Sequence, residues 1–309
     1  MAKHELSGIY PATPTPHGAD GKLNGPVLQR LVEAQLRAGV DGFYVSGATG
    51  EGILHSVEER VETVRLIMDQ VGGRCKVIAH VGAQTTDDAV HLAGQVAALG
   101  VDALSALPPL FYKVPFAAVV DFYRQIATAG GKPLLAYYIP ALSGTAFTVD
   151  QFDELLAIKH VVGVKFSDYN FFVMEQILAR HKDAVVMSGN DEVMVGSLSI
   201  GAAGAIGLTL NLMPALYAQL YRVHAASDID SARQLQNKAN RLIAMILGHG
   251  AGGIVVLKPI LKMLGFDCGA PRGPLPALDE AAECELREQL DGIGFFEDPI
   301  YSAWATDQP

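Results

Sequence analysis

Lys165 is the residue of this sequence with the clearest chemical potential, because it lies near the end of an apolar segment, residues 161–166. Burial lowers the pKa of an amine by disfavouring the ammonium form, and the neutral amine is the nucleophile that condenses with a carbonyl. The sequence therefore predicts an imine-forming lysine. The alternative is an ammonium that reaches solvent or pairs with a carboxylate, and we give this interpretation to Lys258, which lies in a similar segment, residues 254–259.

A glycine-rich loop, residues 47–52, could bind an anion. Its backbone N–H groups and the Thr49 hydroxyl would form a nest for a carboxylate. The same glycines would suit a tight turn without a ligand, and the loop fits neither a dinucleotide fingerprint nor a phosphate loop. Glu51 can be explained without a ligand, as a residue that caps or braces the helix that follows.

Two adjacent tyrosines end a further apolar segment, residues 133–139. Side chains alternate along a strand, so Tyr137 and Tyr138 must face opposite ways. A buried phenol can move protons when it is hydrogen-bonded to other hydroxyls, such as that of Tyr112. An aromatic side chain on a strand is more commonly plain core.

The sequence predicts no metal site. Its nine histidines show no HxH, HxxxH or HExxH spacing, and we interpret the isolated His80 as a hydrogen-bonded core or supporting residue. The three cysteines, Cys75, Cys268 and Cys284, are widely spaced. This pattern predicts neither a disulfide framework nor a zinc site, and it favours a reducing compartment.

The segments that must position these residues alternate in type. Short β-rich apolar segments alternate with amphipathic ones, which is typical of repeated βα units around a parallel sheet. The predicted strands are residues 8–13, 42–46, 76–81, 103–107, 133–139, 161–166, 184–188 and 204–208. The predicted helices include residues 27–38, 57–71, 86–99, 116–127 and 149–158. Ser56 and Thr148 are expected to cap two of them.

We therefore predict an α/β fold, a (β/α)₈ TIM barrel over residues 1–225 with a C-terminal helical extension over 226–309. Helices are expected in the extension at residues 229–247 and 281–290, with a turn at 269–276. Reactive residues of this fold lie at the C-terminal ends of the strands. Lys165, Tyr137, His80 and the loops after residues 46, 107 and 188 meet that condition.

The composition excludes several partners. A net charge of -10 argues against nucleic acid, which needs clustered Lys and Arg. No apolar segment approaches the roughly 20 residues of a membrane span, and the first residues lack a signal core. The expectation is a cytoplasmic protein without a membrane partner.

Three motifs together are similar to those of the dihydrodipicolinate synthase and N-acetylneuraminate lyase superfamily. They lie in the expected order on predicted strands 2, 5 and 6, and the match covers residues 8 to about 275. The motifs are Gly47-Ala48-Thr49-Gly50-Glu51, Tyr137-Tyr138-Ile139-Pro140 and Gly163-Val164-Lys165. The resemblance implies that Lys165 is the Schiff-base lysine.

Further segments resemble the N-acetylneuraminate lyase branch more closely. These are residues 137–144, 174–177 and 189–192. Dihydrodipicolinate synthases place a carboxylate-binding arginine where this chain has Leu142, which makes that activity the less favoured alternative.

The resemblance also implies site roles. Lys165 would attack C2 of a 2-oxo acid, Thr49 and the amides of Ala48 and Thr49 would hold its carboxylate, and Tyr137 would move protons. The iminium would accept the electrons of the C3–C4 bond, so neither a metal nor an organic cofactor is needed. The positions that would hold a sugar tail are Ser167, Gly189, Asp191 and Glu192.

Two positions depart from the branch. Ala48 replaces a hydroxyl residue of the proton relay, and Leu208 stands where the lyases have a serine against the glycerol tail.

The expected function is a class I lyase that reversibly cleaves sialic acid or a related 2-keto-3-deoxy sugar acid to pyruvate and an aldehyde. A sugar-acid dehydratase using the same lysine and an inactive pyruvate- or carbohydrate-binding barrel remain as alternatives. By family analogy we expect a homotetramer, in which Tyr112 reaches a neighbouring active site.

Overall fold

Eight parallel strands form the centre of the structure, a computed structural model that describes residues 5–250 and 252–306. Each predicted strand is present, in most cases one or two residues shorter than expected. The strands are β1 (Gly8–Pro11), β2 (Gly42–Val45), β3 (Lys76–His80), β4 (Ala103–Ala106), β5 (Leu134–Tyr138), β6 (Val161–Phe166), β7 (Val185–Ser188) and β8 (Gly204–Gly207).

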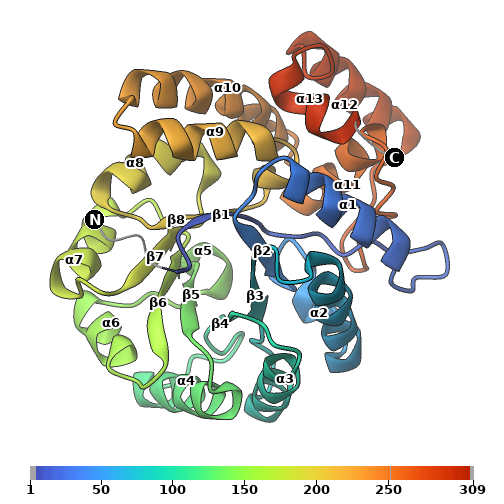
Figure 1. Ribbon diagram of the computed structural model, residues 1–309. Helices are drawn as coiled ribbons and strands as arrows, with labels where there is room; N and C mark the ends of the chain where they lie inside the picture. Colours follow the sequence, from blue (N-terminus) through green and yellow to red (C-terminus); the bar gives the residue numbers. More distant parts are fainter. Residues whose placement is uncertain (1–4, 251, 307–309) are drawn as a thin grey trace.

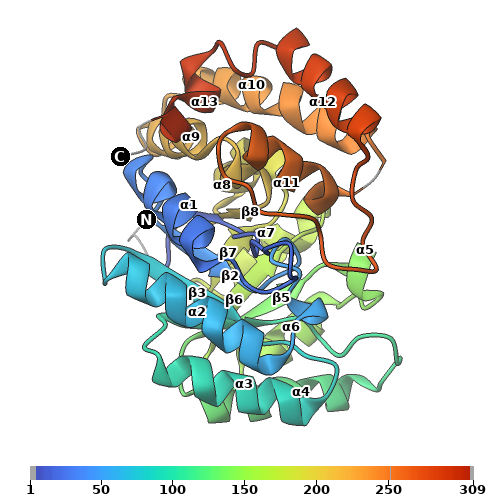
Figure 2. The same ribbon diagram turned by 90° about the vertical axis from the view of Figure 1, so that its right-hand side faces the viewer.

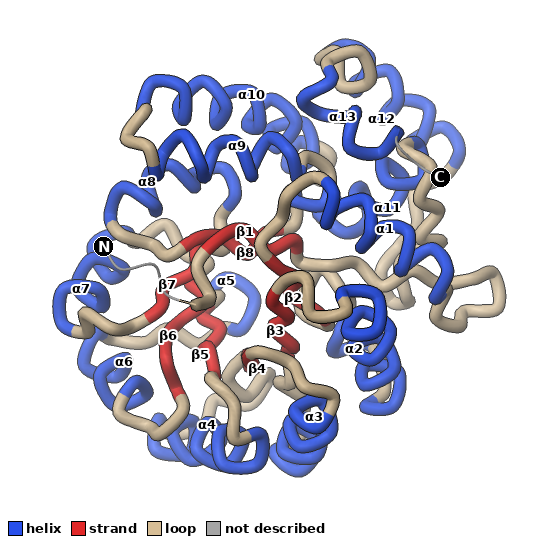
Figure 3. Tube along the Cα trace, viewed as in Figure 1, coloured by secondary structure: helices blue, strands red, loops and turns tan. Residues whose placement is uncertain are grey.

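The sheet closes into a barrel (Figures 1 and 3). Consecutive strands are neighbours from β2 to β8, and β8 pairs with β1. Between β1 and β2 a bridge joins Ala12 to Tyr44, and the Thr13 N–H donates to the Tyr44 carbonyl at 2.9 Å. The prediction of a TIM barrel is confirmed.

Nine helices follow or interrupt the strands in the barrel part of the described chain, and the longer ones form its outer layer (Figure 3). They are α1 (Gly25–Arg37), α2 (Val57–Val71), α3 (Thr86–Ala98), α4 (Phe116–Gly130), α5 (Pro140–Ser143), α6 (Val149–Leu156), α7 (Phe171–Arg180), α8 (Met194–Ile200) and α9 (Pro214–Ala225). Three short 3₁₀ segments, Gly52–Leu54, Asp191–Val193 and Thr209–Asn211, lie just after β2, β7 and β8. Ser56 and Thr148 cap α2 and α6, as expected, and each also forms a capping box.

Side-chain alternation along the strands separates two apolar clusters. One lies between the strands and the outer helices and contains Tyr138, Val164 and Phe166. The other fills the barrel interior and contains Tyr44 and Tyr137. The direction of each strand side chain therefore decides whether it supports the fold or reaches the barrel mouth.

The chain continues past α9 in α10 (Ile229–Gly248), α11 (Gly253–Met263), α12 (Glu280–Gly292) and α13 (Pro299–Thr306). α10 and α13 pack against α9, and the segment after α11 passes along the side of the barrel towards α5 (Figure 2). α11 holds Lys258 and was not among the predicted helices. No single helix of the described chain is long and apolar enough to cross a membrane, although α10 and α11, bent by 119°, meet the length and composition test as a pair.

Candidate active site

Lys165 lies inside the barrel near the C-terminal end of β6. Its side chain is 3% exposed, and its Nζ lies 4.0 Å from the ring centroids of both Tyr44 and Tyr137. Burial lowers the pKa of Lys165 to about 7, and the negative charge of Asp191 partly opposes this effect. A large fraction of these amines is therefore neutral, and hence nucleophilic, at neutral pH.

Glycine at position 163 brings β6 and β7 close together beside this lysine. A Cβ at Gly163 would lie 1.9 Å from the carbonyl oxygen of Val185. Only glycine allows this approach, which pairs Lys165 with Met187 of β7. The glycine of the third motif thus has a packing role next to the reactive amine.

The two adjacent tyrosines face opposite ways, as predicted. Tyr137 lies in the interior beside Lys165, whereas Tyr138 packs outward against Phe147 and Phe152. Burial raises the pKa of Tyr137 to about 12. The Ser167 side chain lies close enough to lower that pKa slightly, but its buried Oγ has no hydrogen-bond partner in the described chain, so we regard the two hydroxyls as neighbours rather than partners.

Tyr44 is the most important residue that sequence reasoning missed. It is fully buried, its hydroxyl donates to Ser105 Oγ at 3.1 Å, and its ring meets that of Tyr137 edge-on at 6.1 Å. The two rings enclose the amine of Lys165, and their π faces favour a cation there. The alternation of side chains along β2 could have indicated that Tyr44 is buried in the barrel, but not that it lies against Lys165 of β6.

A cavity of about 370 Å³ opens above Lys165, among the loops that follow the strands. Seven of the predicted site residues line it, namely Ala48, Thr49, Tyr137, Lys165, Ser167, Gly189 and Leu208. Asn190, which lies in the selected loop after residue 188, also lines it, as do Asp168 and Tyr169, which were not predicted. Asp168 and Tyr169 follow Ser167 along the chain, so the same strand-end rule could have included them.

The glycine-rich loop presents two free donors at this cavity. Within the described chain, the backbone N–H groups of Ala48 and Thr49 have no hydrogen-bond acceptor. The loop is closed by hydrogen bonds from the Glu51 N–H to the Ala48 carbonyl and from the Gly52 N–H to the Gly47 carbonyl, both 3.0 Å. Two free amides and a hydroxyl in one turn can bind a carboxylate.

The two acidic residues after β7 are less free than the sequence suggested, and neither lines the cavity. Asp191 Oδ2 accepts hydrogen bonds of 2.7 Å from both the N–H and the hydroxyl of Thr209. Its Oδ1 is buried without a partner in the described chain and lies behind Gly207, where a Cβ would come within 1.5 Å. Burial raises the pKa of Asp191 to about 6. Glu192 accepts a hydrogen bond from the Tyr169 hydroxyl.

Tyr112 does not join the site of its own chain. It lies in the loop between β4 and α4, is 75% exposed, and its ring packs edge-on against the exposed Phe111. Two adjacent aromatic rings in solvent are unusual and mark a surface that could meet another molecule.

His80 is a buried hydrogen-bonded residue, as expected. Its Nε2 accepts from the Leu107 N–H at 3.1 Å, and its Nδ1 lies 3.2 Å from the Ser46 carbonyl oxygen. Burial, reinforced by the nearby Arg60, holds its pKa well below the usual value, so the ring is neutral. Within residues 5–250 and 252–306, no three His, Cys, Asp or Glu side chains lie where they could share a metal ion.

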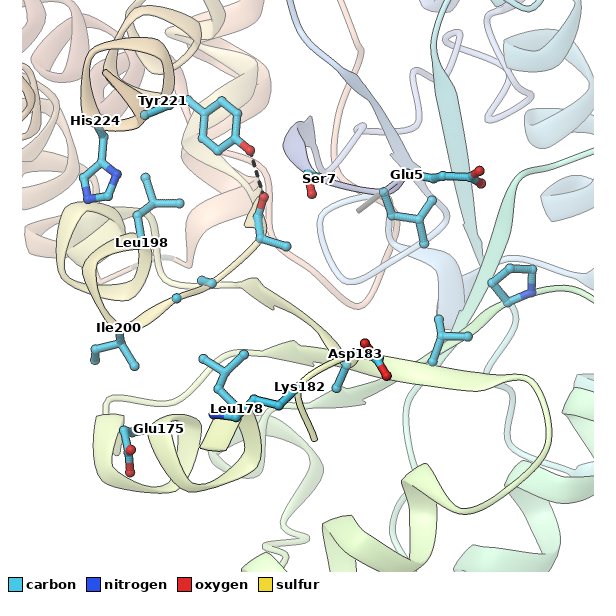
Figure 4. Close-up of a pocket in the computed structure, with 18 of the residues that line it drawn as sticks. Glu5, Ser7, Glu175, Leu178, Lys182, Asp183, Leu198, Ile200, Tyr221 and His224 are labelled. Carbon is cyan, nitrogen blue, oxygen red and sulfur yellow. Dashed lines mark hydrogen bonds between the residues drawn. The ribbon is translucent and has the colours of Figure 1, made fainter. Parts of the chain in front are cut away.

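A larger cavity, about 1170 Å³, lies at the opposite end of the barrel, and Figure 4 shows the residues that line it. Residues that precede or begin the strands line it, including Ser7 and Lys76, together with Leu178, Tyr221 and His224 of the outer helices. Functional residues of TIM barrels lie at the other end of the strands. We therefore assign the site to the smaller cavity, which contains the shifted lysine.

The fold and this site define a TIM-barrel protein with a reactive lysine at its C-terminal mouth, and the comparisons with known proteins agree. The Dihydrodipicolinate synthetase family matches residues 5–293, and the chain belongs to this family. N-acetylneuraminate lyase from Rhizobium meliloti is 36% identical over 286 residues, covering 93% of this chain and 95% of the relative. The Escherichia coli lyase is 34% identical over 292 residues, covering 92% and 98%.

Solved structures give the same result. The sialic acid aldolase of Ruminococcus gnavus superimposes with a TM-score of 0.90 at 32% identity, covering 94% of this chain and 98% of that chain. N-acetylneuraminate lyase from Fusobacterium nucleatum gives a TM-score of 0.87 at 31% identity, covering 94% and 99%. By this homology the chain is a pyruvate-dependent class I aldolase.

Proposed function

We propose that this protein reversibly cleaves a 2-oxo sugar acid to pyruvate and an aldehyde through a Schiff base at Lys165. The observation that carries the proposal is the amine itself, which is buried between Tyr44 and Tyr137 with its pKa lowered to about 7 and borders the cavity. A neutral amine attacks a ketone, whereas an ammonium does not.

The site residues divide the reaction between them. The amides of Ala48 and Thr49 bind the carboxylate of the 2-oxo acid, which places its C2 near Lys165. The amine attacks C2, and loss of water from the carbinolamine leaves an iminium. We assign Tyr137 as the acid–base group for this dehydration, because its ring lies 4.0 Å from the amine and burial raises its pKa to about 12.

The iminium then draws electrons out of the C3–C4 bond. Tyr137 as phenolate takes the proton of the C4 hydroxyl, C4 leaves as the aldehyde carbonyl, and the bonding pair becomes an enamine. The Tyr137 hydroxyl then gives its proton to C3 of the enamine, which regenerates the iminium. Water adds at C2, the Tyr137 phenolate takes back the proton that this hydrolysis releases, and pyruvate leaves with the free amine restored. The rings of Tyr44 and Tyr137 and the nearby carboxylate of Asp191 favour the cationic intermediate. The scheme uses no metal and no organic cofactor.

The relatives are named for sialic acid, and we propose that this chain prefers a shorter or less polar substrate tail. Leu208 contributes an aliphatic wall to the cavity. Ser167 lines the same cavity, and its buried Oγ has no partner in the described chain, so it is available to a hydroxyl group of the tail. One oxygen of Asp191 and one of Glu192 already accept protein hydrogen bonds.

We also propose a homotetramer in the cytoplasm. The exposed pair of Phe111 and Tyr112 supplies a surface through which Tyr112 would reach the site of a neighbouring subunit. The cysteines are free, which suits a reducing compartment.

Trapping with borohydride tests the covalent step. Incubation with pyruvate and borohydride should convert the imine to a stable secondary amine, and a peptide map should place the adduct on Lys165. Lys165→Ala should remove it. Absence of an adduct in the native protein, or an unchanged adduct in Lys165→Ala, would overturn the proposal.

A substrate panel then distinguishes the reactions that begin from this imine. An aldolase releases pyruvate, which a lactate dehydrogenase-coupled assay detects, whereas a dehydratase retains every carbon atom in one product. We expect pyruvate release from at least one 2-keto-3-deoxy sugar acid. Adduct formation without turnover of any substrate would indicate a binding protein instead.

A further inference from the structure

A second buried lysine, Lys258, lies outside the barrel on α11 and contacts the glycine-rich loop. It is 1% exposed, and its Nζ forms an ion pair of 2.6 Å with Glu51 Oε1. The same Nζ donates to the Ala270 carbonyl at 3.1 Å. Both side chains of the pair are fully buried, so removal of either one would leave a buried charge without its partner.

The other oxygen of Glu51 is also held by the C-terminal extension. Oε2 accepts a hydrogen bond from the Arg272 backbone N–H. The Arg272 guanidinium in turn binds both oxygens of Glu59 on α2, at 2.6 and 2.8 Å. Two residues of the extension therefore hold one carboxylate from opposite sides, and α2 anchors one of them.

The histidines of this cluster add no charge at neutral pH. His17 Nδ1 lies 3.4 Å from Lys258 Nζ, and His17 Nε2 lies 2.9 Å from His55 Nε2. Burial lowers the pKa of both rings to about 4. The positive charges of Lys258 and Arg272 therefore equal the negative charges of Glu51 and Glu59, and the cluster is neutral without an external ion.

Glu51 occupies a backbone position that requires such support. Its φ is +56°, in the left-handed region that a residue with a side chain rarely adopts. Its N–H donates to the Ala48 carbonyl at 3.0 Å, so its conformation determines the turn that carries the free amides of Ala48 and Thr49. A displacement of the Glu51 side chain would move those amides relative to Lys165.

We propose that Glu51 and Lys258 are positioning residues for the substrate carboxylate. Their ion pair holds the turn so that the Ala48 and Thr49 amides meet the carboxylate while Lys165 meets C2. The extension thus sets the affinity for the 2-oxo acid although none of its residues lines the cavity. This inference rests on the proposed function, because it takes the loop as the carboxylate site.

Three variants test the ion pair. Lys258→Met and Glu51→Gln each remove one charge, and the double variant removes both without leaving an unpaired buried charge. Lys262→Met is the matched control, because Lys262 lies on the same helix in an exposed ion pair with Glu283 at 3.3 Å. The readouts are the pyruvate concentration that half-saturates borohydride trapping, and kcat and the KM values of pyruvate and aldehyde in the synthetic direction.

We expect the half-saturating pyruvate concentration and the pyruvate KM to rise at least tenfold in the double variant and in each folded single variant. The aldehyde KM and the control should stay unchanged. If the ion pair were purely structural, its loss would lower the melting temperature and leave both pyruvate values at their native level. That result in the double variant would overturn this inference, whereas the proposed function would still be supported by the adduct that native protein forms with pyruvate. If native protein forms no adduct with pyruvate, the proposed function fails and this inference fails with it.

Discussion

The pKa of Lys165 determines the pH at which the imine can form. Burial lowers it from 10.5 to about 7. At pH 7 about half of the amines are then neutral, against roughly one in 3000 for an amine with the ordinary pKa. The lowered pKa therefore raises the concentration of the neutral amine about a thousandfold at neutral pH.

The rate of adduct formation with pyruvate should follow this titration. Trapping with cyanoborohydride at low pyruvate, from pH 5 to pH 10, should give a rate that rises about tenfold per pH unit at low pH and levels off above about pH 8. The direction follows from the chemistry, because the neutral form reacts and a higher pH produces more of it. Free lysine under the same conditions is the reference.

Asp191→Asn tests the cause of the midpoint. The Asp191 carboxylate opposes the lowering of the lysine pKa, and its removal should move the midpoint of the profile to a lower pH. A native trapping rate that still climbs tenfold per unit between pH 8 and pH 10 would refute the lowered pKa. A midpoint that moved upward in Asp191→Asn would refute the electrostatic contribution assigned to this carboxylate.

Three further results are expected. Tyr137→Phe should lower kcat on the order of a hundredfold or more, whereas Tyr138→Phe, which alters an outward side chain, should retain near-native kcat in the same assay. Leu208→Ser should raise kcat/KM for N-acetylneuraminate by about fivefold, the equivalent of one hydrogen bond of about 1 kcal/mol. If the native protein cleaves N-acetylneuraminate efficiently and no substrate of the panel is better, the proposed preference for a shorter or less polar tail is wrong. Lys165→Met should be inactive, yet below pH 7, where the native fold buries an ammonium, its free energy of unfolding in urea should exceed that of the native protein by up to roughly 5 kcal/mol. This difference should shrink as the pH rises towards 10.5. An unchanged difference across that range would show that the buried charge is not its origin.

The features that the sequence determined by itself are local or periodic. The β-rich segments, the two capping boxes and the opposite directions of Tyr137 and Tyr138 all depend on residues close together in the chain. Lys165 was recognisable because burial in an apolar strand disfavours the ammonium form and leaves a neutral, nucleophilic amine. The three motifs were enough to identify the family that the comparisons confirm.

Only the tertiary structure decided which distant groups meet. Tyr44 encloses Lys165 from another strand, Thr209 occupies an oxygen of Asp191, and Lys258 pairs with a residue more than 200 positions earlier in the chain. Such contacts depend on barrel closure and on the path of the extension, since the partners of a buried charge are those that the whole fold brings within a few ångströms. Sequence spacing carries no record of these distances. The sequence could therefore assign Lys258 an ammonium that either reaches solvent or pairs with a carboxylate, but it could not decide between the two or name Glu51.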